Sequence, residues 1–164
     1  AEIDVVMAKK IGAPFNPEYA VAAVDPEGEV LTLEGSQWAP LHDHIIEQAE
    51  DRGREISKSL RKFRGGREGP SIAGRTVFVV DDGLATGLTA MAALKYIRNK
   101  NPKEIILAVP VAPAETLDSL RPLVDDIICP LCPRVFHAVG EWYVSFAQVD
   151  DQDVVKTLTQ NVEG

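Results

Sequence analysis

The chain has 164 residues, of which 45% are hydrophobic and 26% are charged, and these values fit one globular domain with a sizeable core. Its formal net charge of −8 argues against nucleic acid as a partner, because binding to a phosphate backbone needs a basic surface. No apolar run approaches the ~20 residues that cross a bilayer, and the first residues lack a signal-peptide pattern, so we expect a cytoplasmic protein without a membrane partner.

The N-terminal part predicts three strands. The apolar run 3–8 is typical of a buried strand, and Lys9-Lys10 at its end would reach the surface. Residues 19–24 and 30–33 predict two strands of a hairpin around the sequence Asp25-Pro26-Glu27-Gly28. Proline at the second position and glycine at the fourth suit a type I turn, so this turn would join the two strands.

One long amphipathic helix is predicted next. Apolar residues from Leu41 to Phe63 recur three, four or seven positions apart, and Gly65-Gly66 would end the helix. The end of this segment is basic, with one acid, Glu55, among Arg52, Arg54, Lys58, Arg61, Lys62, Arg64 and Arg67. This basic segment could be a lid that closes over an anionic ligand, or its side chains could form the solvated face of the helix.

Beyond residue 70 strands and helices alternate. We predict strands at 76–80, 105–109, 126–129 and 143–146 and helices at 86–98, 114–120 and 151–158. Strands joined through helices form parallel sheets. The predicted fold is therefore α/β: a single domain, 1–164, with a mainly parallel sheet, helices on both faces, and a hairpin and long helix inserted at about 15–70.

Two adjacent carboxylates follow the strand Thr76 to Val80. Asp81 and Asp82 would stand at the carboxyl edge of the sheet, where open α/β folds bind their ligands. Two like charges raise each other's energy unless hydroxyl groups, a metal ion or lysines lie near. The pair therefore predicts a polyhydroxylated or cationic ligand.

A glycine-rich turn continues from the two aspartates. Gly83 and Gly87 allow backbone angles closed to other residues, so the amide groups of Ala85 to Thr89 can converge on one anion at a helix N-terminus. Thr86 adds a hydroxyl donor, as does Thr89. The motif is neither a Walker loop nor a dinucleotide fingerprint, since it lacks both spacings. It predicts a phosphate cradle, and the alternative is a tight turn with two incidental aspartates.

The segment from Val77 to Thr89 resembles the phosphoribosyl pyrophosphate motif of type I phosphoribosyltransferases. The similarity to a bacterial branch of predicted phosphoribosyltransferases extends over nearly the whole chain, through Lys9-Lys10-Ile11-Gly12-Ala13-Pro14, Asn16-Pro17-Glu18, Ala108-Val109-Pro110-Val111-Ala112-Pro113 and Ala138-Val139-Gly140-Glu141-Trp142-Tyr143. The resemblance implies a transferase of nucleotide metabolism that binds phosphoribosyl pyrophosphate and a base, and that forms a homodimer.

The resemblance also implies roles for individual residues. Asp81 and Asp82 would bind the ribose hydroxyls, and Lys10 would face the pyrophosphate; these three are the expected catalytic residues. The expected substrate-binding residues are Gly83, Ala85, Thr86, Gly87, Leu88, Thr89 and Lys9. Magnesium would be the cofactor, held by pyrophosphate and ribose oxygens, so no side chain is assigned as a metal ligand. A solvated strand end is the alternative for the two lysines.

The type I fold normally has a strand and a glycine-containing pyrophosphate loop upstream of the lysine position. Neither precedes Ile3 in this sequence. Two functions therefore stay open: magnesium-dependent transfer of a 5-phosphoribosyl group to an unidentified nitrogenous acceptor with release of pyrophosphate, or a non-catalytic module that senses phosphoribosyl pyrophosphate or a nucleotide.

Two further clusters lie in the C-terminal part. Cys129 and Cys132 form a Cys-x-x-Cys that fits small buried hydrophobes, half a zinc site or a redox pair. The second is an aromatic cluster formed by Phe136, His137, Trp142 and Tyr143. Its rings could stack on the acceptor base or belong to the core.

Overall fold

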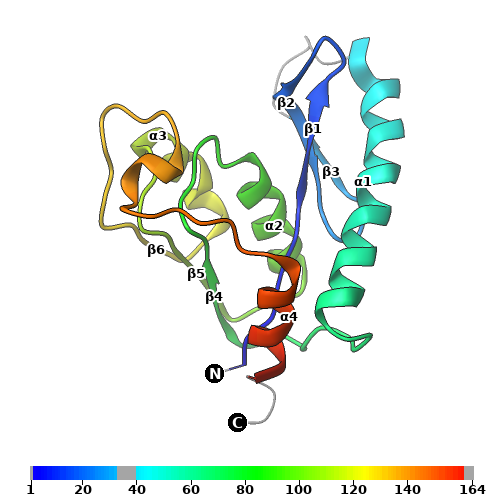
Figure 1. The fold of residues 1–164 in the computed structure, drawn as a ribbon, viewed down its shortest axis with the longest axis vertical. Coiled ribbons are helices and arrows are strands. Elements are labelled where there is room, and N and C mark those ends of the chain that lie inside the picture. The colour runs from blue at the N-terminus through cyan, green and yellow to red at the C-terminus, as the bar shows by residue number, and fades with distance from the viewer. Residues whose placement is uncertain (1, 33–39, 161–164) are drawn as a thin grey trace. The chain divides into compact units, whose positions relative to one another are not determined.

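The computed structural model describes residues 2–32 and 40–160 (Figure 1). The chain forms two compact units: Ala1–Ser71 with Gln148–Gly164, and Ile72–Ala147. Each unit has its own three-stranded sheet, antiparallel in the first and parallel in the second. The single domain over 1–164 stays a prediction.

The sheet of the first unit has the order β1-β2-β3, formed by Lys9–Ala13, Asn16–Val24 and Val30–Thr32. Its β2–β3 turn confirms the predicted hairpin, because the Gly28 amide donates to the Asp25 carbonyl at 3.1 Å. Asp25 is 4% exposed, and its Oδ1 accepts the amides of Glu27 and Glu29 at 2.8 and 3.0 Å. The hairpin therefore holds a buried carboxylate that is satisfied by its own turn. Leu33, the last residue predicted for the hairpin, lies outside the described residues.

The strand predicted at 3–8 is wrong, because β1 begins at Lys9. Within the described chain, residues 3–8 pair with no strand, and a strand needs a hydrogen-bonded neighbour as well as an apolar sequence.

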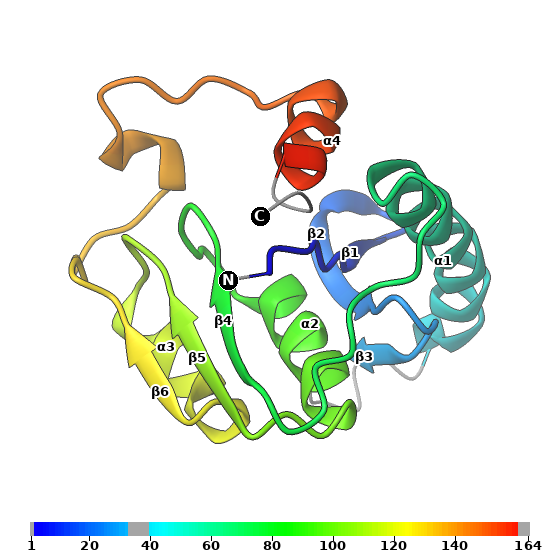
Figure 2. The same cartoon turned by 90° about the horizontal axis from the view of Figure 1, so that it is seen from below.

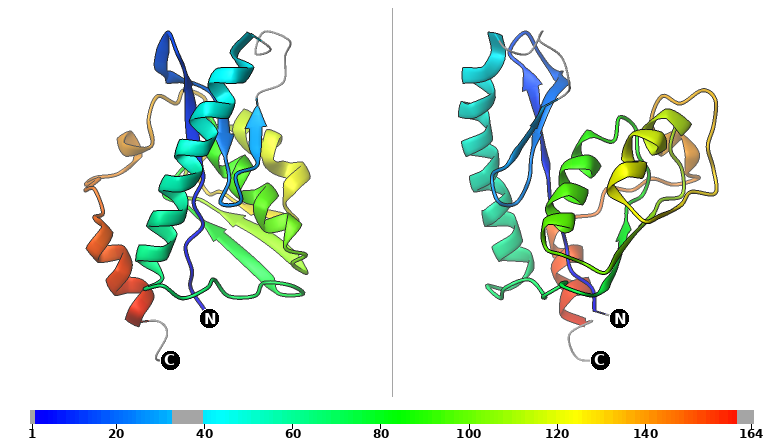
Figure 3. Two further views of the ribbon diagram at one scale, coloured as in Figure 1. Left: turned by 90° about the vertical axis from the view of Figure 1, so that its right-hand side faces the viewer. Right: turned by 180° about the vertical axis from the view of Figure 1, so that it is seen from behind.

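Helix α1 (His42–Phe63) confirms the predicted long helix and packs along β1 and β2 (Figures 1 and 3). Gly65 and Gly66 have φ of 59° and 79°, and the Gly66 amide donates to the Arg61 carbonyl at 2.8 Å, which ends the helix as expected. The packed core consists of Ile11, Ala13, Val21, Ala22, Val24, Ile45, Ala49, Ile56 and Leu60.

Acids of the same unit pair with much of the basic end of α1. Arg64 Nη2 lies 2.6 Å from Asp4 Oδ2, and Lys62 Nζ lies 2.7 Å from Asp151 Oδ2 on α4 (Asp151–Gln160). Asp150 caps α4 by accepting the amides of residues 152 and 153. These pairs favour a structural role for the basic segment over a lid.

The second unit carries the parallel sheet, in the order β4-β5-β6, and Figure 2 shows its three strands side by side. Its elements in chain order are β4 (Thr76–Val80), α2 (Leu88–Asn99), β5 (Glu104–Ala108), α3 (Ala114–Leu120), η2 (Arg121–Leu123), β6 (Asp126–Ile128) and η3 (Val139–Trp142). This confirms the predicted alternation of strand and helix, whereas the strand predicted at 143–146 is wrong. Residues 143–147 pair with no strand of the described chain; their aromatic side chains pack on one another instead.

The two faces of the parallel sheet differ in exposure. Ile105 and Leu107 on β5 are fully buried on one face. On the other face Phe78, Val80 and Ile128 are 60%, 73% and 50% exposed. Among the described helices, none is long and apolar enough to span a membrane.

Candidate functional site

The chain leaves β4 directly into the two aspartates, so both stand at the carboxyl edge of the parallel sheet, as predicted. Both residues are exposed, and the Asp82 amide donates to Asp81 Oδ1 at 2.9 Å. Partial burial of its carboxyl group raises the pKa of Asp81, and the neighbouring Asp82 carboxylate acts in the same direction. The ionised Asp81 is thus held at a free-energy cost that a hydroxyl donor or a cation would relieve.

The turn after the aspartates has no room for side chains at its two glycines. A Cβ on Gly83 would lie 2.7 Å from Val139 Cγ1 and 3.0 Å from Val111 Cγ1. A Cβ on Gly87 would lie 2.7 Å from Thr116 Cγ2, and Gly87 also has the left-handed φ of 73°. Both positions therefore require glycine, for packing as well as for backbone conformation.

Gly87 is the N-cap of α2, and its left-handed conformation explains why the helix begins at Leu88 rather than at the predicted residue 86. In the described part of the chain, the amides of Ala85, Thr86 and Gly87 donate no hydrogen bond, and the first amides of a helix have no acceptor within the helix. The first turn of α2 holds no acidic residue, so its partial positive charge is uncompensated.

The exposed residues of the turn are Ala85, Thr86 and Thr89, and neither threonine hydroxyl bonds to another described residue. Leu88 is 4% exposed, so its backbone N–H is the group that it offers to a ligand. We call Asp81–Thr89 the cradle: amide and hydroxyl donors at one end and two carboxylates at the other.

Two contacts that the sequence did not predict fix the cradle to α3 and to the segment between β5 and α3. Thr116, 5% exposed at the start of α3, donates from Oγ1 to the Ala85 carbonyl at 2.6 Å. The Leu84 amide donates to the Val111 carbonyl at 3.0 Å. No local pattern marks Thr116 or Val111, because each acts on a residue far away in the sequence.

The aromatic cluster contributes one direct contact to the cradle. Tyr143 donates from its hydroxyl group to the Asp82 carbonyl at 2.6 Å. Its ring packs on Phe146 with centroids 5.2 Å apart, and Phe136 stacks on Trp142 at 6.3 Å. The sequence marked Tyr143 as an aromatic near the site, but it could not show that the hydroxyl group holds the backbone of the carboxylate pair.

The two lysines predicted to face the pyrophosphate belong to the first unit, on β1. Lys9 Nζ lies 2.6 Å from Glu55 Oε2, and Lys10 Nζ lies 3.1 Å from Glu18 Oε2. The Lys9 ammonium is the main reason that the pKa of Glu55 is lowered, and Arg52 adds to it. Exposed ion pairs of this kind contribute little to stability and exchange partners readily, so both lysines keep the capacity to bind an anion.

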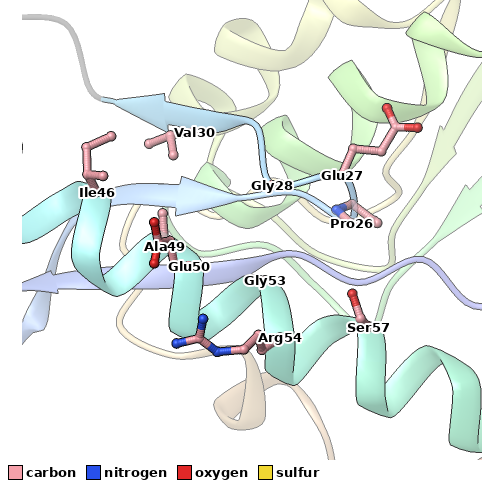
Figure 4. A pocket seen from close by; sticks show the side chains of 10 residues that line it. All are labelled: Pro26, Glu27, Gly28, Val30, Ile46, Ala49, Glu50, Gly53, Arg54 and Ser57. Atoms are coloured by element: carbon pink, nitrogen blue, oxygen red, sulfur yellow. The ribbon is translucent and has the colours of Figure 1, made fainter.

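A hollow of about 550 Å³ lies in the first unit, between the β2–β3 turn and α1 (Figure 4). It contains none of the predicted site residues. Its charged lining consists of Glu27, Glu50 and Arg54, and Arg54 pairs with Asp51. An acidic lining repels phosphate, so this hollow is a poor candidate for the predicted ligand.

The family model described as "Phosphoribosyl transferase domain" matches residues 34–145. Two Mycobacterium tuberculosis proteins, from strains CDC 1551 and H37Rv and both named "Putative phosphoribosyl transferase", are 34% identical to this chain over 160 residues. These matches cover 96% of this chain and 36% of each relative, so the chain spans about a third of the length of the curated relatives that it matches.

The crystal structure of TT1426 from Thermus thermophilus has a TM-score of 0.77 and 34% sequence identity to this chain. The match covers 98% of this chain and 76% of that one. Together with the parallel sheet and its helices, this likeness confirms the predicted α/β class. The chain belongs to the phosphoribosyl transferase domain family, with the cradle after β4 at the position where the sequence motif predicts the ligand.

Proposed function

We propose that the protein transfers the 5-phosphoribosyl group of phosphoribosyl pyrophosphate to a nitrogenous acceptor and releases pyrophosphate, with Mg²⁺ as its cofactor. The observation that carries this proposal is the cradle. Unpartnered amides stand at the N-terminus of α2, and two carboxylates stand at the end of β4. A phosphate group and a pair of hydroxyl groups are the ligands that these two ends favour, and a ribose 5-phosphate carries both.

In this proposal the amides and hydroxyls of Ala85 to Thr89 bind the 5-phosphate, and Asp81 and Asp82 accept hydrogen bonds from the ribose 2′ and 3′ hydroxyls. Hydrogen bonds to the ionised carboxylates lower the raised pKa of Asp81, so the ligand removes the cost of its partial burial. Lys10, with Lys9 beside it, binds the pyrophosphate after leaving its exposed ion pair with Glu18.

The donor chemistry of the cradle fits Mg²⁺, which binds proteins through few carboxylates and takes the rest of its shell from water and phosphate oxygens. Residues 2–32 and 40–160 contain no group of three or more side chains that could hold a metal ion by themselves. The substrate oxygens would therefore supply most of the shell, near Asp81 and Asp82. When bound, Mg²⁺ neutralises negative charge on the leaving pyrophosphate.

Calorimetry with phosphoribosyl pyrophosphate and Mg²⁺ tests the ligand. Each carboxylate contributes about 1.5 kcal/mol or more through hydrogen bonds to charged groups, so Asp81→Ala with Asp82→Ala should weaken binding by about 100-fold or more. The matched control is Asp118→Ala, which removes an exposed acid of α3 in the same unit and should leave the affinity unchanged. Equal affinity of the double variant and the wild type would contradict the ribose assignment.

Pyrophosphate release across a panel of purine, pyrimidine and other nitrogenous bases tests turnover. Release with one acceptor class supports the transferase. Saturable binding without release from any base supports the second function, a module that senses phosphoribosyl pyrophosphate or a nucleotide.

A further inference from the structure

Two thiols outside the cradle lie close together in the loop that follows β6. Cys129 comes directly after the strand and is half-buried, and Cys132 is exposed. Their Sγ atoms are 3.8 Å apart and unbonded. A disulfide needs about 2 Å between the sulfurs, so a small local movement of one side chain within the same loop would join them.

A metal site does not explain the pair. In the described part of the chain no third histidine, cysteine or carboxylate joins it, whereas a closed zinc site needs four ligands. His137, the histidine nearest in sequence, is exposed and lies 3.5 Å from Glu141. We propose that Cys129 and Cys132 are a redox-active dithiol that low-molecular-weight disulfides convert to an intramolecular disulfide.

The two cysteine residues differ in exposure, and this difference sets the order of the reaction. Burial raises the pKa of the Cys129 thiol, and its contact with Cys132 adds to the effect, so Cys129 forms its thiolate less readily than an ordinary cysteine. Cys132 is the thiol that a dissolved disulfide can reach. Cys132 is therefore the attacking sulfur, and Cys129 is the resolving sulfur.

The steps balance with a small disulfide, such as oxidised glutathione, as the oxidant. The Cys132 thiolate attacks one sulfur of the oxidant, which forms a mixed disulfide and releases one glutathione thiolate. The Cys129 thiol loses its proton to solvent and attacks the Cys132 sulfur, which releases the second glutathione. The protein loses two electrons and two protons, and the oxidant gains them as two thiols.

Backbone hydrogen bonds connect the dithiol loop to the cradle. Leu131, between the two cysteines, donates its amide to the Pro110 carbonyl and accepts the Ala112 amide, each at 3.2 Å. Val111, between those two residues, accepts the Leu84 amide of the cradle at 3.0 Å. The Cys129 thiol also donates to the Leu131 carbonyl at 3.4 Å, and the disulfide removes this donor.

Oxidation should therefore change the protection of amides beyond the loop itself. The Ala112 amide shares its acceptor with the Cys129 thiol, so its hydrogen exchange should change most, followed by that of Leu84. The inference concerns the thiols alone and stands independently of the proposed transferase activity.

The test is intact-mass spectrometry of the folded protein in glutathione buffers of increasing oxidised fraction, with thiols trapped by acid and alkylation. In oxidising buffer the mass of the wild type should fall by two hydrogen atoms, with neither glutathione nor the alkylating reagent attached to the two cysteines. Cys129→Ser should accumulate the mixed disulfide on Cys132, since it lacks the resolving thiol. Cys132→Ser should react more slowly than Cys129→Ser, by on the order of tenfold, because its remaining thiol is half-buried and its pKa is raised.

Three results would overturn the proposal. One is a wild type that keeps both thiols when nearly all glutathione is oxidised, and another is a wild type that forms only disulfides between molecules. The third is an adduct on Cys132→Ser that forms as fast as that on Cys129→Ser, which would contradict the assigned order. The first two results are measured on the wild-type protein, so they test the proposal even if a substitution impairs folding.

Discussion

The hydrogen bond from Thr116 to the Ala85 carbonyl offers a sharp test of how the cradle is held. Thr116→Val replaces the hydroxyl group by a methyl group of similar size and keeps the methyl group that lies against Gly87. One neutral hydrogen bond contributes about 0.5–1.5 kcal/mol net. Ala85 is exposed, so water can reach its carbonyl group, and we expect a loss of about 1 kcal/mol in the free energy of unfolding.

The control, Thr116→Ser, keeps the hydroxyl group and removes the methyl group instead. Urea unfolding of the three proteins should show the loss in Thr116→Val as a lower midpoint with unchanged slope. Calorimetry should show weaker binding of phosphoribosyl pyrophosphate, by about fivefold for 1 kcal/mol, because the Ala85 end of the cradle is no longer fixed. If Thr116→Val matches the wild type in both measurements while Thr116→Ser does not, packing and not the hydrogen bond holds the cradle.

Four other substitutions test the remaining features of the second unit. Gly87→Ala should lower the free energy of unfolding in urea by at least about 1–2 kcal/mol, since alanine disfavours a φ of 73° and its Cβ would clash with Thr116 Cγ2. The control is Gly53→Ala, where the added Cβ on helix α1 meets no atom, and this variant should not lower the free energy of unfolding. Tyr143→Phe should weaken phosphoribosyl pyrophosphate binding in calorimetry by up to about tenfold, since it removes one hydrogen bond to Asp82; an unchanged affinity would mean that the hydroxyl group does not position the carboxylates. Asp81→Asn should raise the thermal midpoint of the unliganded protein at neutral pH yet impair binding. Because the pKa of Asp81 is raised in the folded protein, the charged carboxylate destabilises the fold at pH values above its folded-state pKa. This destabilisation disappears as the pH falls from the folded-state pKa to the ordinary value of 3.8, so the difference between Asp81→Asn and the wild type should shrink over that interval. Asp125 has the opposite sign: the Ile105 amide and then Arg98 hold its pKa below 3.8, so it stabilises the fold above that value and loses this effect as pH falls below it. Asp125→Asn should therefore lower stability at pH 7 and flatten the acid limb of a stability–pH profile, and an unaltered acid limb would refute this role.

Local sequence predicted the elements that local forces decide. The β-branched run from Thr76 to Val80 and the glycines around the cradle each impose their conformation, so strand, turn and helix start near their predicted positions. The strand predicted at 3–8 failed because apolar character does not supply a pairing partner. The strand predicted at 143–146 failed because the Tyr143 and Phe146 rings pack on each other, which aromatic content alone does not reveal.

For the candidate site, too, the sequence predicted the features that local residues decide. The motif from Asp81 to Thr89 predicted where the carboxylates and the glycine turn stand, because backbone freedom and charge are visible in the sequence, and their role as ligand-binding residues stays a prediction. The hydrogen bonds made by Thr116 and Tyr143 were not predicted, because a hydrogen bond between distant segments leaves no local pattern. Lys9 and Lys10 lie on β1 of the first unit, and their role as pyrophosphate ligands stays a prediction.

The close fit around Gly83 has a consequence for changing this protein. The Cγ1 methyl groups of Val139 and Val111 occupy the space where a side chain at position 83 would lie, so the three residues pack in one confined space. A larger residue at position 83 calls for a smaller one opposite it, and Gly83→Ala combined with Val139→Ala should be less harmful than the sum of the two single changes. An engineer who wishes to reshape the turn therefore has to alter positions 83 and 139 together.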